Sequence, residues 1–233
     1  AALLQSAQLY QQADNFSKAT LVYKRYIYTY PDLSEQTFYA RSALADIYAK
    51  LGQLTSRDYW LDDIVKSAEF AEVQQDSAIQ FLAAKASLTL AESKFSEFES
   101  VRLIEPLREN LAKKKQKMEL ALAAYRKTSD YNYAEFVTAA SHRTGEIYFK
   151  LSTALLESAR PENLDEEEME QYEMMLEEQA YPFEEKAIKF LESNVARVDE
   201  GIYTDWVDKS YVTLGKLLPV QYAKHELPSG VVD

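Results

Sequence analysis

The sequence predicts an all-α fold, and three observations lead to that prediction. The chain has 233 residues, of which 47% are hydrophobic, enough for a sizeable core. It contains only five glycines and six prolines, too few for the many tight turns of a β-sandwich or barrel. Apolar residues recur at helical spacing, as at Ile79, Leu82, Ala86 and Leu90. We therefore expect helices joined by short turns along most of the chain.

Residues 1–33 predict a first pair of helices. The spacing of Ala7 and Tyr10 resembles a tetratricopeptide repeat, and this resemblance implies that Ala7 lies where the two helices approach most closely and that Tyr10 fills the space between them. Ala19 takes the matching contact position on the second helix, and Pro31 ends that helix.

Residues 34–70 predict a second, degenerate helix pair. Asp32 and Glu35 have the spacing of a capping box before its first helix, and Gly52 supplies the backbone freedom for the turn. Arg57 takes the position that the small residue Ala19 takes in the first pair, so the second helix of this pair departs from the pattern of the first pair.

Residues 77–130 predict a long helix pair. Ser77 is expected to cap the first helix, whose periodicity continues to about Glu105, and Pro106 is expected in the first turn of the next. The lysine-rich stretch 113–117 is interpreted as a solvated turn of that helix; a recognition patch is the alternative.

Residues 131–198 predict another helix pair, interrupted by an acidic insertion at 159–180. Gly145 on the first helix, near residues 133–158, is expected to approach Ala187 on a second helix over residues 181–198. Asn163 is expected to cap a separate helix within the insertion.

The chain is expected to form one helical repeat domain over residues 1–224. A terminal helix is expected at residues 203–218, and residues 225–233 are interpreted as a tail or linker.

The spacing of Ala7 and Tyr10, repeated by Gly145 and Tyr148, together with Pro31 after the second helix, resembles the tetratricopeptide repeat family. This resemblance implies an α–α superhelix, a solenoid of roughly three to five helix pairs, with an acidic helical insertion. It also implies that the first helix of each pair lines a concave groove that binds a partner.

A second resemblance concerns the C-terminal stretches 161–164, 179–187 and 217–219. They are similar to periplasmic repeat proteins of Gram-negative bacteria encoded beside envelope motor complexes of the TonB and gliding-motility type. This resemblance implies a periplasmic or envelope-associated protein that binds envelope complex components. A cytoplasmic location is the alternative, since many cytosolic proteins also lack cysteine.

Composition disfavours several other classes. The chain has no cysteine and only two histidines, His142 and His225, so we expect no catalytic residues, cofactor or metal site. A net charge of −12 has the wrong sign for a nucleic-acid surface. The longest stretch without a charged residue, residues 1–13, is too short to span a membrane.

Candidate binding residues come from the inner-face positions that the first resemblance implies. They are Gln8, Gln11, Tyr39, Ser42, Asp46, Lys50, His142, Glu146, Phe149 and Lys150. Ordinary solvated helix surface is the alternative for each. His142 is expected on the same wall, with Arg143 opposing its protonation.

A secondary docking element is expected on the acidic insertion, where an apolar stripe lies beside dense negative charge. The stripe consists of Met169, Tyr172, Met175 and Leu176. The alternative is that this stripe packs on the repeat scaffold while the carboxylates face water.

The function predicted from these observations is that of a non-catalytic scaffold or adaptor, binding a partner peptide or helix in the concave groove, in the bacterial cell envelope. Two alternatives stay open: a structural subunit of a homo- or hetero-oligomeric envelope assembly, and a sensor domain for a small ligand or peptidoglycan fragment. The partner's identity and the oligomeric state are not predicted.

Overall fold

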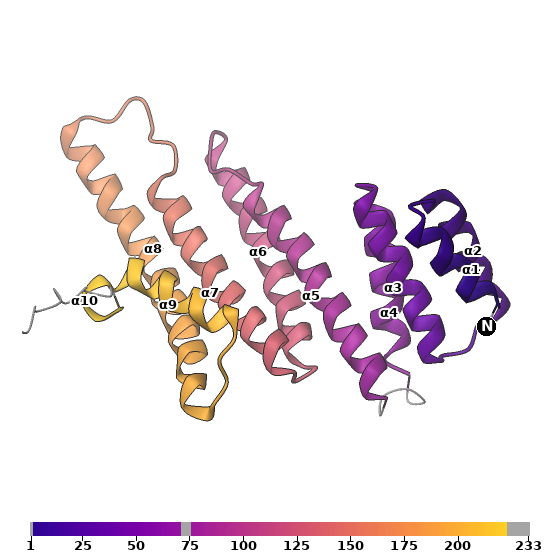
Figure 1. Cartoon of the computed structure of the whole chain (residues 1–233). Coiled ribbons are helices and arrows are strands. Elements are labelled where there is room, and N and C mark those ends of the chain that lie inside the picture. The colour runs from indigo at the N-terminus through magenta and orange to yellow at the C-terminus, as the bar shows by residue number, and fades with distance from the viewer. Residues whose placement is uncertain (1, 71–75, 223–233) are drawn as a thin grey trace, which may run out of the picture. The chain divides into compact units, whose positions relative to one another are not determined.

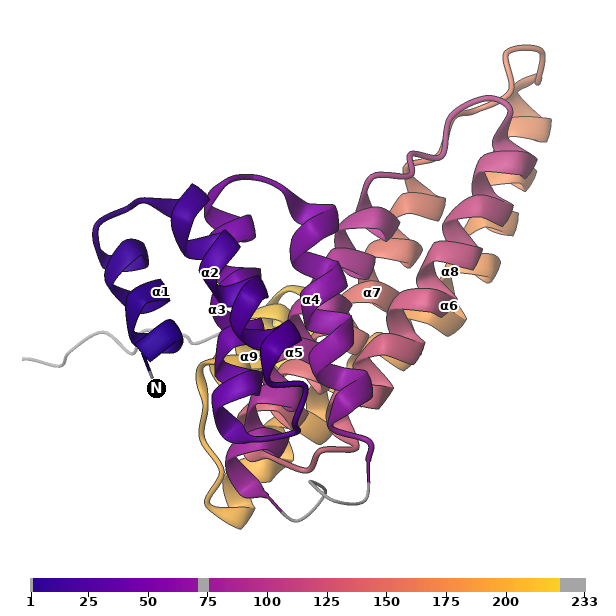
Figure 2. The same cartoon turned by 90° about the vertical axis from the view of Figure 1, so that its right-hand side faces the viewer.

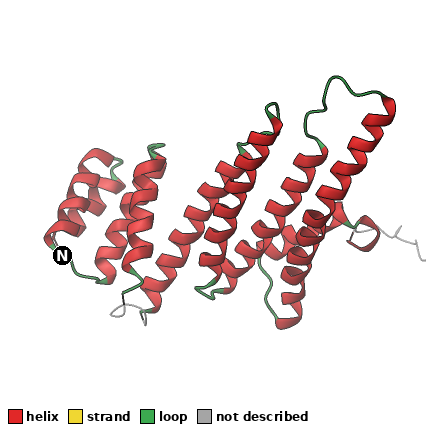
Figure 3. Cartoon of the chain, turned by 180° about the vertical axis from the view of Figure 1, so that it is seen from behind, coloured by secondary structure: helices red, strands yellow, loops and turns green. Residues whose placement is uncertain are grey.

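The computed structural model describes residues 2–70 and 76–222, and all regular structure in these ranges is helical (Figures 1 and 3). Ten α-helices and one short 3-10 helix account for it. The prediction of an all-α fold is confirmed. The predicted tail at 225–233, with His225, lies outside the described residues.

The residues group by their contacts into two compact units, and the division passes through three long helices. The first unit, Ala1–Lys94 with Arg126–Phe136, contains the helices α1 (Ala2–Gln12), α2 (Phe16–Thr29), α3 (Glu35–Lys50), α4 (Leu54–Ser67) and most of α5 (Ser77–Glu99). The second unit, Phe95–Tyr125 with Val137–Asp233, contains most of α6 (Leu107–Ser129) and α7 (Ala134–Leu156), then α8 (Glu166–Val195), η1 (Ala196–Glu200), α9 (Asp205–Leu217) and α10 (Pro219–Tyr222).

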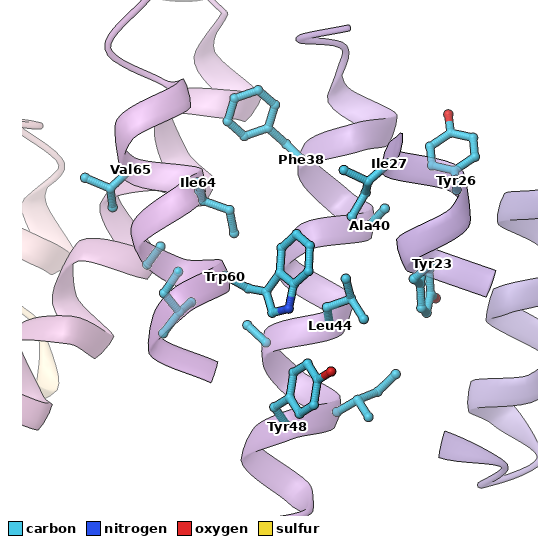
Figure 4. Packing of buried hydrophobic residues seen from close by; sticks show 14 of the residues in the cluster. Tyr23, Tyr26, Ile27, Phe38, Ala40, Leu44, Tyr48, Trp60, Ile64 and Val65 are labelled. Atoms are coloured by element: carbon cyan, nitrogen blue, oxygen red, sulfur yellow. The ribbon is translucent and has the colours of Figure 1, made fainter. Parts of the chain in front are cut away.

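Neighbouring helices of the first unit pack in chain order, α1 on α2, α2 on α3 and α3 on α4 (Figures 1 and 2). Large side chains fill the space between them, including the buried Tyr23, Phe38, Leu44, Trp60 and Ile64 (Figure 4). Burial of apolar surface at about 25 cal/mol per Å² is the main force that holds these helices together.

The predicted contact positions of the first helix pair are confirmed. Ala7 and Ala19 are fully buried, and Tyr10 packs against the core. The turn between the helices places Asp14 at φ 53°, and the Asn15 side chain accepts a hydrogen bond from the Lys18 amide (3.3 Å) to cap α2. Gly52 has φ 69°, which confirms that the next turn needs its freedom.

Two predicted helix caps are wrong. Asp32 does not form a capping box with Glu35; its carboxylate accepts a hydrogen bond from the Ser34 hydroxyl (2.9 Å), and Ser34 precedes α3. Asp76, not Ser77, caps α5, because its side chain accepts from the amides of residues 78 and 79 (3.0 and 3.1 Å). Asp76 and Ser77 are both residue types that favour the capping position, and which of them caps α5 depends on where the helix begins.

The acidic insertion is not a separate helix. Its helical part is the first half of α8, which continues through Pro182 to Val195. Asp165, not Asn163, begins the helix, in a capping box with Glu168 at 2.9 and 3.0 Å. The predicted start of the second helix at residue 181 is therefore wrong.

The lysine-rich stretch is not uniformly solvated. Lys113 and Lys115 are exposed, but Lys114 is only 4% exposed, and its ammonium group donates to the carbonyls of Phe98 (3.1 Å) and Val101 (2.8 Å). Helix α5 ends at Glu99, not near residue 105, and Lys114 binds the carbonyls at this end. The solvated interpretation is wrong for Lys114.

The predicted close approach at Gly145 is confirmed. An added Cβ would lie 2.7 Å from Leu191 Cγ and 3.3 Å from the Ala187 carbonyl oxygen. Leu191 is fully buried, so it has little room to move away.

Gly145→Ala is expected to destabilise the protein by about 1–2 kcal/mol, because overpacking outweighs the gain in helix propensity. Gly215→Ala is the matched control: its Cβ would lie an ordinary 3.6 Å from the Tyr222 carbonyl oxygen, so a gain of up to about 1 kcal/mol is expected. Urea unfolding of both variants measures the difference, and equal midpoints would contradict the packing argument.

Candidate partner-binding site

Three predicted residues on two helices line one open hollow in the first unit. Gln8 and Gln11 come from α1 and Lys50 comes from α3; Gln12 and Asp14 complete the lining. The hollow has a volume of about 570 Å³. The fold therefore brings Lys50 beside Gln8 and Gln11, which come 42 and 39 positions earlier in the sequence.

A buried tyrosine holds one of these amides. The Tyr23 hydroxyl donates to Gln11 Oε1 (2.7 Å), and burial raises the pKa of Tyr23. Gln11 Nε2 has no partner among the described residues. Gln8 is exposed, and neither its amide oxygen nor its amide nitrogen has a partner in the same ranges. Each amide can hydrogen-bond to another chain.

The hollow also carries charges of both signs. Lys50 is exposed, and its ammonium lies 5.5 Å from the centre of the Phe16 ring. Asp14 is exposed at the turn after α1. A partner with mixed polarity would find complementary groups at this surface.

Two further predicted residues, Ser42 and Asp46, line a smaller pocket between α3, α4 and α5. Its volume is about 110 Å³. Desolvation raises the pKa of Asp46, while Lys85 and Lys50 act in the opposite direction. Tyr39, also on α3, is 52% exposed and does not line this pocket.

In the second unit the predicted residues lie on α7, and His142 is not exposed. His142 is 5% exposed, its Nδ1 lies 3.1 Å from Ser210 Oγ, and its ring lies 5.6 Å from that of Trp206. Burial lowers its pKa to about 4; Glu146 opposes this shift, and Arg143 and Lys209 add to it. The predicted effect of Arg143 has the right direction but is smaller than burial. The prediction that His142 faces a partner is wrong.

Glu146 and Lys150 are paired within the second unit. Glu146 accepts from Arg143 (2.6 Å) and lies 3.6 Å from the Lys150 ammonium, which also pairs with Glu99 (2.9 Å). Phe149 is half-buried. These charges would have to exchange existing partners to bind a new one, unlike the amides of the first unit.

The predicted secondary docking stripe has mixed exposure. Met175 is 40% exposed, Met169 and Tyr172 are half-buried, and Leu176 is only 4% exposed. Leu176 therefore packs on the protein, as the alternative interpretation expected for the whole stripe.

Sequence reasoning missed several residues that line the two pockets, among them Arg57 of α4 and Lys85 of α5. The resemblance to the repeat family gave no inner-face positions on the helix that carries Lys85, so Lys85 was not among the predicted binding residues. Its spacing of four residues from Thr89, which also lines the pocket, was an available signal.

A larger open hollow of about 660 Å³ in the first unit contains none of the predicted residues. Glu69, Lys127 and Tyr131 line it, and the Glu69–Lys127 ion pair (2.6 Å) occupies two of its charges. Burial and Glu69 raise the pKa of Tyr131 to about 12, so this phenol is neutral at physiological pH.

No family model, curated protein or solved structure matches the chain. In the part of the chain that the structure describes, no cluster of three or more histidine and carboxylate side chains could hold a metal ion. Within the same ranges, no helix has the length and apolar character needed to cross a bilayer.

Proposed function

We propose that the chain is a non-catalytic scaffold of the tetratricopeptide-repeat type, and that it binds a segment of a partner protein at the hollow between α1 and α3. One observation carries the proposal: Gln8, Gln11 and Lys50, assigned to a binding face from sequence, line the same hollow. Helix-pair packing in chain order supports the repeat architecture.

The chemistry of the hollow favours an extended partner segment. An extended backbone presents amide and carbonyl groups that pair with the amides of Gln8, Gln11 and Gln12. Their supporting helices are fixed by the buried core, so binding orders few groups of the scaffold. We place this interaction in the bacterial cell envelope, with the cytoplasm as the alternative.

Self-assembly is the second candidate function, and exposed apolar residues on α2 favour it. Leu21 is 68% exposed and Tyr28 is 70% exposed. They lie seven positions apart, two turns along the same side of the helix. A mass that rises with protein concentration in solution would support this candidate.

Removing the side chains of the hollow tests the first proposal. A variant with Gln8→Ala and Lys50→Ala is expected to lose at least about tenfold in affinity for the partner captured by crosslinking from Gram-negative envelope extract. Its matched control, Gln171→Ala with Lys66→Ala, changes the same residue types at exposed positions outside the hollow. Capture by wild type and control but not by the variant supports the proposal; equal capture by all three contradicts it.

A further inference from the structure

The pocket between α3, α4 and α5 contains polar groups that the protein itself does not satisfy. Asp46 forms no hydrogen bond or ion pair among the described residues, and the hydroxyl of Ser42 has no partner there. The ammonium of Lys85 is likewise unpaired in the described ranges. The exposed Asp46 carboxylate and the exposed Lys85 ammonium thus line one small pocket and attract each other, but they form no hydrogen-bonded ion pair.

Arg57 also lines the pocket, and only part of its guanidinium group is hydrogen-bonded. Its Nε donates to Asp58 (2.8 Å) and its Nη2 donates to Ser93 (2.7 Å), while Nη1 has no partner within the described ranges. These two contacts fix the guanidinium plane beside the pocket. Nη1 remains available for an anionic group.

The charges are arranged by helix. Ser42 and Asp46 lie four residues apart on α3, and therefore on the same side of that helix. The cations come from the other two helices, Arg57 from α4 and Lys85 from α5. Acceptors for a cation thus stand on one wall, and donors for an anion stand on the others.

The remaining lining is apolar and the pocket is small. Leu61 and Ile64 of α4 and Leu82 of α5 contribute hydrocarbon surface. A volume of about 110 Å³ is well below the roughly 300–1,000 Å³ of a pocket for a drug-sized ligand. The occupant has only a few heavy atoms.

We propose that this pocket binds a small zwitterion, an α-amino acid with a short apolar side chain. Asp46 and Ser42 hold its ammonium group. Lys85 and Arg57 hold its carboxylate, and the short side chain lies against the apolar lining. This site is distinct from the hollow of the proposed function and does not depend on it.

A zwitterion fits better than an ion of either single sign. A simple cation would be repelled by Lys85, and a simple anion would be repelled by Asp46. A zwitterion pairs with both signs and adds no net charge. Desolvation raises the pKa of the Asp46 carboxyl group, and an ammonium group that pairs with the carboxylate offsets this cost.

Calorimetric titration of the full chain with L-alanine tests the proposal. Alanine is expected to bind at least about tenfold more tightly than propionate, which lacks the ammonium, or alaninamide, which lacks the carboxylate. Glycylglycine, whose charges are farther apart, separates a free amino acid from a short peptide and is expected to bind as weakly as these analogues. No binding of alanine at millimolar concentrations, or equal binding of any of the three analogues, would overturn the proposal.

Variants place the ligand in the pocket. Asp46→Asn and Lys85→Gln are each expected to weaken alanine binding at least about tenfold. Asp62→Asn and Lys66→Gln, made at an exposed ion pair outside the pocket on α4, make the same chemical changes and are expected to leave it unaltered. Unchanged binding in Asp46→Asn, with its fold verified by circular dichroism, would also overturn the assignment.

Discussion

Lys114→Met is expected to lower the free energy of unfolding by about 3 kcal/mol. The substitution keeps much of the side-chain volume but removes the Lys114 donor from both carbonyls. The Phe98 carbonyl keeps the Val101 amide (3.3 Å), and the Val101 carbonyl is left without a donor among the described residues. A buried group that loses its partner costs about 1–3 kcal/mol. The loss of the contact between the ammonium and the Phe98 ring, 4.3 Å away, adds to this effect. Burial lowers the pKa of Lys114, which shows that holding the charge inside already has a cost, so the net loss falls below the sum of the separate contacts.

Lys115→Met provides the matched control for this prediction. Lys115 is the next residue in the same lysine run but is exposed, so the change should stay within about 0.5 kcal/mol. Urea unfolding followed by circular dichroism measures both. If Lys114→Met is as stable as Lys115→Met, the two carbonyl contacts do not hold the end of α5.

Acid destabilisation through His142 is the second large effect. The pKa of His142 is about 4 in the folded protein, against an ordinary value of about 6.5 in the unfolded chain. The unfolded chain therefore takes up the proton first as the pH falls. Stability is unaffected by this group above about pH 6.5 and declines between about pH 6.5 and 4, by about 3 kcal/mol in total.

His142→Gln isolates this contribution, because glutamine does not titrate and can still bond to Ser210. Subtracting the variant's urea-unfolding profile from that of wild type, from pH 7 to pH 4, removes the contribution of the carboxylates common to both. The difference between the two free energies of unfolding is expected to change by about 3 kcal/mol between pH 7 and pH 4. Parallel profiles, or an NMR titration of the His142 ring with a midpoint near 6.5, would contradict the burial argument.

Features set by neighbouring residues could be predicted from the sequence. The sequence predicted close helix contacts at Ala7, Ala19 and Gly145, because each is a small residue at a regular spacing from aromatic residues. A larger side chain at these positions would collide with the facing helix. The turn at Gly52 was predictable for the same reason, because the glycine and its flanking polarity lie within a few residues.

Features set by distant contacts could not be predicted. Lys114 looks like any exposed lysine until the end of α5 places two carbonyls beside it. Pro182 is a helix-breaking signal in isolation, yet it lies within α8. His142 is buried because α9 supplies Ser210 and Trp206 against it, and nothing near residue 142 in sequence indicates that.

The candidate site divides in the same way. Gln8, Gln11 and Lys50 lie on the first helices of two successive helix pairs. The resemblance to the repeat family was therefore enough to choose them as candidate binding residues. The zwitterion pocket needed Arg57 and Lys85 as well, whose part in it becomes visible only when α4 and α5 meet α3.

The most direct test of partner binding at the α1–α3 hollow is site-specific photocrosslinking in living Gram-negative cells. A photoreactive amino acid replaces Gln8, which lines the hollow, or Leu21, which is exposed on α2 and outside it. The proposal predicts a covalent adduct with one other protein at residue 8 and its absence at residue 21. An adduct at residue 21 alone, with a second copy of the chain or with another protein, would contradict it and move the interface to α2.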